Sequence, residues 1–176
     1  MNIKHILYSG LGASLLLAGS GCKKDFLTTN PSTGQTIDQI FANTKSAYNA
    51  INGLHSYMTT PVGDDQFGHS SFMLVNDLLG NDMPIGNSGH WFRTQYNYQE
   101  HRTANGGLPG YAWGYYYSII NNANLILERI DNVPGVEEER QDIKGQALFY
   151  RAFGYMNLIQ YYQHTYLGHE SDKGIP

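Results

Sequence analysis

Cys22 is the residue whose chemistry is best defined by its neighbours, because it is the only cysteine and follows the small residues Gly19-Ser20-Gly21. The preceding stretch from Ile6 carries no charge, and Lys4 provides a short basic start. This layout is typical of a secretory signal and is too short for a stable membrane span. A thiol directly after such residues is what lipoprotein processing acylates before cleavage. We therefore predict that residues 1–21 are a cleaved signal peptide and that Cys22 carries the lipid anchor. The alternative is an ordinary secretory signal with an incidental cysteine.

No other group of residues has the spacing of a catalytic or metal-binding motif. Neither the zinc pattern H-E-x-x-H nor the nucleophile pattern G-x-S-x-G occurs. Asp77 and Asp82 resemble a glycosidase carboxylate pair, but two acids five residues apart near a helix end are common. His164 and His169 are close in sequence without a metal motif around them. We predict no catalytic residue, no metal and no cofactor, and Asp82→Asn would test the glycosidase alternative.

The mature chain has the size and charge of one acidic domain. Removing 21 of the 176 residues leaves 155, and the loss of Lys4 changes the net charge from −4 to −5. There is no basic run beyond Lys23-Lys24, which argues against nucleic acid as a partner. Fourteen tyrosines accompany only 15% charged residues. Because tyrosine combines an apolar ring with a hydroxyl, this composition favours a surface for partly apolar, partly hydrated ligands.

Helical periodicity predicts a mainly α fold after an irregular tether at 22–34. Apolar residues three and four apart predict a helix from Thr44, as N-cap, to Met58, and a shorter helix at 69–79. Two long helices follow, one after Pro109 and one opened by the glutamates at 137–139. Their expected buried stripes are Trp113, Tyr117, Ile120, Ala123, Leu127 and Ile130 on the first, and Ile143, Ala147, Tyr150, Gly154, Leu158 and Tyr161 on the second.

The two long helices are expected to form a closely packed antiparallel hairpin because their connection is short. The small residues that favour close approach are Gly145, Ala147, Ala152 and Gly154. The end of the chain, at 169–176, has no helical pattern. Because nothing there completes a fold, we expect residues 35–176 to be an N-terminal helical domain that is incomplete at its C-terminus.

Three stretches, taken together, carry a family resemblance. They are Cys22–Leu27 (CKKDFL), Trp113–Leu127 (WGYYYSIINNANLIL) and Lys144–Leu158 (KGQALFYRAFGYMNL). They resemble the N-terminal third of the SusD/RagB family of outer-membrane nutrient-uptake lipoproteins, and the resemblance covers nearly the whole chain in order. Two positions depart from the family pattern, Gln146 where glutamate is common and Tyr150 where leucine is usual.

The resemblance implies a fold, a place and an activity. The expected helical hairpins themselves resemble tetratricopeptide units, so the fold would consist of tetratricopeptide-like helical hairpins with long aromatic-rich loops. The protein would be lipid-anchored on the outer membrane, facing the cell surface. There it would capture glycan or another oligomeric nutrient and pass it to a TonB-dependent, SusC-like transporter.

Residues 80–110 are the candidate ligand-binding segment, since they show no sustained period and long loops in compact domains are usually functional or disordered. Sugar recognition combines aromatic rings that stack on pyranose faces with amide, carboxylate and guanidinium groups that bind hydroxyls. In and beside this segment the candidates are Trp91, Arg93, Tyr96, Asn97, Tyr98, Asp77 and Asp82. The alternative is that Trp91 and Tyr96 only fold the loop onto the helices.

Other aromatic and polar residues are expected to be structural. Trp113, Tyr116 and Tyr117 have helical spacing, which is more typical of a core than of a binding ladder. Asn124 is expected to satisfy backbone groups of the neighbouring helix, and Arg151 to be a hydrogen-bonding anchor. A different function stays open, in which the chain is a helical repeat-type adaptor at the cell envelope that binds only protein. Substituting the aromatic residues of the loop would separate the two functions.

Overall fold

The computed structural model of the protein describes residues 34–86, 89–103 and 106–175. Contacts divide the chain into two units at Thr36, and the second unit, Ile37–Pro176, holds all the helices described below. The predicted signal peptide, Cys22 and most of the tether lie outside the described residues. Within the described ranges the regular secondary structure is entirely helical, with no strand, which confirms the mainly α class.

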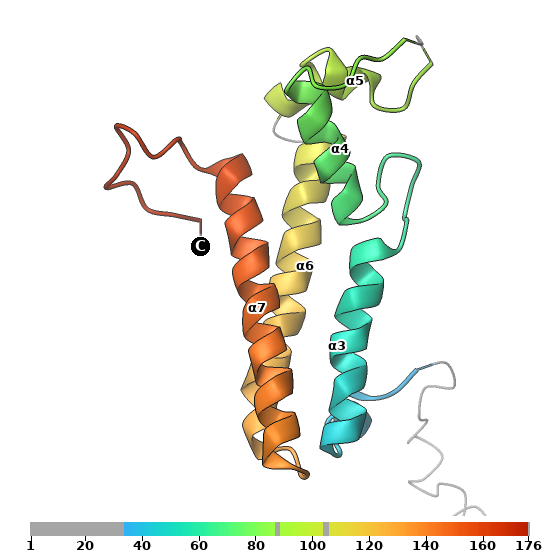
Figure 1. Ribbon diagram of the computed structural model, residues 1–176, viewed down its shortest axis with the longest axis vertical. Coiled ribbons are helices and arrows are strands. Elements are labelled where there is room, and N and C mark those ends of the chain that lie inside the picture. Colours follow the sequence, from blue (N-terminus) through green and yellow to red (C-terminus); the bar gives the residue numbers. More distant parts are fainter. Residues whose placement is uncertain (1–33, 87–88, 104–105, 176) are drawn as a thin grey trace, which may run out of the picture. The chain divides into compact units, whose positions relative to one another are not determined.

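The second unit contains both long and short helices (Figure 1). In chain order they are α2 (Ile37–Ile40), α3 (Thr44–Thr59), α4 (His69–Leu79), α5 (Arg93–Tyr96), the 3-10 turn η2 (Glu100–Arg102), α6 (Gly107–Arg129), the 3-10 turn η3 (Ile130–Asn132) and α7 (Glu137–Tyr162). Figure 1 shows α6 and α7 side by side, which confirms the predicted antiparallel hairpin, and α3 contacts both. None of the described helices has the length and apolar character needed to cross a bilayer.

The start of α3 differs from the prediction in its capping residue. Asn43, not Thr44, is the N-cap, and its side-chain oxygen accepts a hydrogen bond of 2.9 Å from the Ser46 N–H. Thr44 is the first helical residue and is buried. Its hydroxyl donates to the Glu139 carboxylate at the start of α7, so Thr44 ties two helices together instead of capping one.

The main core lies between α3, α4, α6 and α7. Its largest fully buried side chains include Ile51, Phe72, Tyr115, Tyr116, Ile119, Ile126, Ile143 and Leu158. The stripe predicted for α7 is confirmed from Ile143 to Leu158, although Tyr161 is 36% exposed. Burial of these apolar groups is the main stabilising contribution to the hairpin.

The stripe predicted for α6 is wrong in part. Ile120, Ala123 and Ile130 are buried, but Trp113 is 42% exposed, and Tyr117 and Leu127 are only half-buried. The buried face instead follows alternating spacings of four and three residues, through Ala112, Tyr116, Ile119, Ala123, Ile126, Ile130 and Val133. Trp113 therefore lies beside the core, at its edge.

Helices α6 and α7 approach closely at Gly154, which is buried. A Cβ atom at this position would lie 2.6 Å from Ile120 Cγ1 and 3.2 Å from the Tyr116 carbonyl oxygen. The other small residues of α7 differ in their surroundings: Ala147 is buried, whereas Gly145 and Ala152 are exposed. The predicted close approach is thus made at Ala147 and Gly154.

Candidate functional site

The segment between α4 and α6 is built from short helical turns, α5 and η2, that lie at the end of α4 (Figure 1). A second apolar cluster fixes it, formed by the buried side chains of Val75 and Leu78 from α4 and Phe92 just before α5. Phe67 contacts Phe92 edge-on, with ring centroids 5.9 Å apart. Because the segment has its own buried cluster, its backbone is positioned by packing and not by local sequence alone.

Glu100 connects this segment to the start of α6. One carboxylate oxygen, Oε1, accepts a hydrogen bond of 2.7 Å from the Leu108 N–H in the first turn of α6. The other, Oε2, accepts from the Gln95 amide and, at 3.2 Å, from the Thr94 hydroxyl. Gln95 is only 2% exposed, so its amide depends on this partner. A carboxylate at a helix N-terminus is also stabilised by the helix dipole, so Glu100 holds α5 against α6.

Two of the predicted binding residues, Tyr96 and Tyr98, help to anchor the segment. Tyr96 is partly buried against the second apolar cluster. The Tyr98 hydroxyl donates a hydrogen bond of 2.6 Å to the Leu79 carbonyl oxygen at the end of α4. Tyr98 also has a φ of +56°, an uncommon conformation for a residue other than glycine. The Tyr98 hydroxyl thus bonds the end of α4, and Tyr96 packs against the cluster that α4 shares with Phe92.

Three other predicted residues, Trp91, Arg93 and Asn97, are exposed. Trp91 is 65% exposed, which is high for such a large apolar ring. Arg93 and Asn97 follow it on and after α5, one helical turn apart, with the Asn97 N–H donating to the Arg93 carbonyl oxygen at 2.9 Å. The structure therefore divides the predicted group into two tyrosines that contact neighbouring elements, of which Tyr98 is still 37% exposed, and three other exposed residues on or beside α5.

Asp77 and Asp82 lie near the end of α4, and both are exposed. The Asp82 N–H donates to the Asp77 carbonyl oxygen at 3.0 Å, so the contact between them is made by the backbone. The general acid of a glycosidase works from a shielded position, which these exposed carboxylates do not have. They remain candidates for binding ligand hydroxyls.

Sequence reasoning missed an aromatic cavity of about 600 Å³ between α4, α6 and α7. Its aromatic lining consists of Phe72, His101, Trp113, Tyr161 and Tyr162. The Trp113 ring lies edge-on to Tyr162, with centroids 5.0 Å apart, and 4.6 Å from the Tyr117 ring. The signal that could have found this cavity is the four-three spacing that starts at Ala112, because it turns Trp113 away from the core.

The residues predicted to be structural lie in different surroundings. Tyr116 is fully buried, as expected, while Trp113 is not a core residue. Arg151 donates to the Asn124 side-chain oxygen at 3.3 Å, which joins α7 to α6 at the surface. The partner of Asn124 is therefore a side chain and not the helix backbone that we expected. Asn124 and Tyr117 also line a shallower cavity of about 380 Å³ beside Trp113.

Comparison with known proteins places the chain in a family. The SusD-like family, described as "Starch-binding associating with outer membrane", matches residues 25–176. A search of curated proteins gave no match. The family match covers most of the chain and includes the hairpin of α6 and α7 as well as the segment that carries Trp91. Members of this family are binding proteins and not enzymes. The chain therefore belongs to the SusD-like family of outer-membrane glycan-binding proteins.

Proposed function

We propose that the protein captures glycan at the outer membrane through the exposed face of the α5 segment. The observation that carries this proposal is the 65% exposure of Trp91 beside a backbone anchored by Phe92 and Gln95. An exposed indole on a fixed backbone offers a flat apolar face on which a sugar ring can stack. Arg93 and Asn97 lie within one helical turn of each other and supply donors and an acceptor for hydroxyl groups.

Delivery and anchoring form the second part of the proposal. Cys22 would carry the lipid that holds the protein on the outer membrane, facing the cell surface, with the charged residues Lys23, Lys24 and Asp25 as an export tag. The bound glycan, or another oligomeric nutrient, would then pass to a TonB-dependent, SusC-like transporter. The signal-like layout before Cys22 and the family's association with the outer membrane support this.

The anchor is tested by mass spectrometry of the protein purified from bacterial membranes. We expect an N-terminal Cys22 with acyl chains, and we expect Cys22→Ser to move the protein out of the membrane fraction. A leader that is still attached, or an unmodified thiol in a soluble product, would refute the anchoring.

The two tryptophans, Trp91 and Trp113, allow a direct test of the glycan site. In Trp113→Phe, Trp91 is the remaining indole, and its fluorescence should change when a starch oligosaccharide is titrated. Trp91→Ala should weaken binding by about 1–2 kcal/mol, roughly 5- to 30-fold in Kd, because stacking removes about one face of the ring from water. Binding that is lost in Trp113→Phe but kept in Trp91→Ala would instead assign the ligand to the aromatic cavity.

Binding to protein alone is the second candidate function. It is favoured by the large apolar side chains exposed along α7, namely Leu148, Phe149, Met156 and Ile159, each between 43% and 65% exposed. A Phe149→Gln variant should then lose association with a membrane partner while keeping any glycan affinity. Trp91→Ala should do the opposite. Absence of both glycan affinity and co-purification with an outer-membrane barrel would end the leading proposal.

A further inference from the structure

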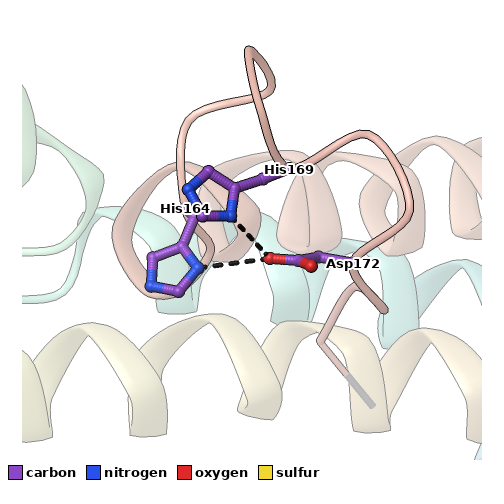
Figure 2. A group of neighbouring side chains, drawn as sticks. All are labelled: His164, His169 and Asp172. Atoms are coloured by element: carbon purple, nitrogen blue, oxygen red, sulfur yellow. Dashed lines mark hydrogen bonds and ion pairs between the residues drawn. The ribbon is translucent and has the colours of Figure 1, made fainter.

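The segment after α7 brings two histidines and an aspartate into one group (Figure 2). Nδ1 of His164 lies 3.2 Å, and Nδ1 of His169 lies 2.9 Å, from the same carboxylate oxygen of Asp172. The centroids of the two imidazole rings are 4.4 Å apart. Figure 2 shows both rings directed toward the carboxylate. Three potential ligand groups therefore converge within a stretch of nine residues.

Backbone turns produce this convergence. The His169 N–H donates to the Tyr166 carbonyl oxygen at 2.9 Å, and the Asp172 N–H donates to the His169 carbonyl oxygen at 3.0 Å. Gly168 lies in the left-handed region, with a φ of +84°, where a residue with a side chain would be strained. Its N–H is bound by the Glu170 carboxylate at 3.0 Å. Consecutive turns thus set the three side chains on the same side of the loop.

The separations between the donor atoms are close to those around a metal ion. Tetrahedral zinc with bonds of about 2.0–2.1 Å holds its ligand atoms about 3.4 Å apart. The two nitrogen–oxygen distances, 3.2 and 2.9 Å, are within a few tenths of an ångström of that value. The donor atoms of all three residues lie within 4.8 Å of one another. The three groups can therefore converge on one ion by rotation of their side chains.

The chemistry of the donor set selects the type of ion. Two imidazole nitrogens and one carboxylate suit zinc and the neighbouring first-row divalent metals. Calcium and magnesium prefer sites made of oxygen atoms. The three side chains are 72%, 42% and 40% exposed and line an open cavity of about 590 Å³, so an ion in solution can reach them.

We propose that His164, His169 and Asp172 form a binding site for a zinc-like divalent metal, with a fourth coordination position left for water. The site shares no residue with the α5 segment or with the aromatic cavity. A bound ion would cross-link the turns that follow α7 and restrict their motion. The H-E-x-x-H pattern does not include it, because the ligands are spaced by five and three residues and no glutamate follows His164.

The test uses the full chain without an affinity tag, treated with EDTA and carrying Cys22→Ser to remove its one thiol. Zinc chloride is titrated by calorimetry, and Co²⁺ by visible absorption, which reports nitrogen and oxygen ligation of low coordination number. We expect one ion per chain. His169→Ala and Asp172→Asn should each weaken zinc binding at least about tenfold, since even the loss of an outer-shell partner costs 10- to 100-fold. His101→Ala, an exposed histidine elsewhere, is the matched control and should bind zinc like the parent.

Hydrogen exchange separates this site from adventitious zinc. Bound zinc should slow amide exchange at residues 164–172 in the parent chain and not in His169→Ala. Circular dichroism should be the same for all variants, because the substituted side chains are exposed. A parent chain that does not bind zinc, equal affinity in parent and His169→Ala, or zinc binding without slower exchange at 164–172 would each overturn the proposal.

Discussion

Replacing Gly154 with alanine tests how tightly α6 and α7 pack. The added Cβ would meet Ile120 Cγ1 at 2.6 Å and the Tyr116 carbonyl oxygen at 3.2 Å. Ile120 is 2% exposed, and the carbonyl belongs to the backbone of α6, so neither can move away without shifting the helix. Overpacking of this kind costs about 1–3 kcal/mol. Against it, alanine stabilises a helix interior by about 1 kcal/mol relative to glycine.

Gly145→Ala in the same helix isolates the packing strain. Nothing lies within 4 Å of a Cβ added at Gly145, so this variant should gain only the helix contribution of about 1 kcal/mol. The difference in free energy of unfolding between the two variants is then the strain at Gly154, about 1–3 kcal/mol. For a chain of this size, the expected gap in Tm is about 2–12 °C. Urea unfolding followed by circular dichroism measures the same difference independently.

Equal stabilisation in the two variants would refute the reasoning. It would mean that α6 and α7 do not approach each other at Gly154 as closely as described. A fall in stability for Gly145→Ala would contradict the second premise, that this side of α7 has room for a methyl group. The unfolding m-value should stay constant in both, because neither change alters the surface exposed on unfolding.

Three further predictions concern pH and the anchoring of α5. Burial lowers the pKa of His69, because the buried site disfavours the charged imidazole. The free energy of unfolding therefore keeps its full value above the unfolded pKa of about 6.5 and falls as pH drops below it. His69→Gln should therefore flatten the decrease in Tm between about pH 7.5 and 5.5, whereas a parallel decrease in His69→Gln and in the exposed control His101→Gln would contradict this. Burial raises the pKa of Tyr115 and Tyr116. These phenols therefore leave the free energy of unfolding unchanged below the unfolded pKa of about 10, and they lower it as pH rises above that value. Absorbance at 295 nm should show these two phenols ionising only as the protein unfolds. Glu100→Gln should weaken the bonds between α5 and α6, speed hydrogen exchange at 93–103 and reduce glycan affinity; unchanged exchange would show that this carboxylate is dispensable.

Helices were predictable from the sequence where one apolar stripe dominates. The range 69–79 of α4 matches its prediction because glycines at 68 and 80 bound it, and the stripe of α7 was identified up to Leu158. Helix α6 carries two adjacent apolar stripes, one through Ala112 and Tyr116 and one through Trp113 and Tyr117. Periodicity cannot choose between them, because the choice depends on the shapes that α3, α4 and α7 present to the helix.

The sequence predicted which segment carries the candidate site, but not which of its residues anchor the backbone and which face solvent. Trp91, Tyr96 and Tyr98 are similar in type, and composition alone does not say how far each of them is exposed, which is 65% for Trp91 and 37% for Tyr98. The answer depends on contacts with α4, such as the bond from Tyr98 to the Leu79 carbonyl, formed across nineteen residues. The group at His164 was missed for a related reason, since it is assembled by turns and not by a linear motif.

The attachment of the turn beside Trp91, through Phe92, Gln95 and Glu100, has a kinetic consequence. The backbone of this surface is settled during folding, so a sugar bound at the proposed site would immobilise few additional backbone bonds. In that proposal no slow rearrangement of the backbone would have to precede capture or follow release, and residence time would depend on a small number of direct contacts. Under the proposed function, such rapid exchange would suit a protein that passes its ligand onward more than one that stores it.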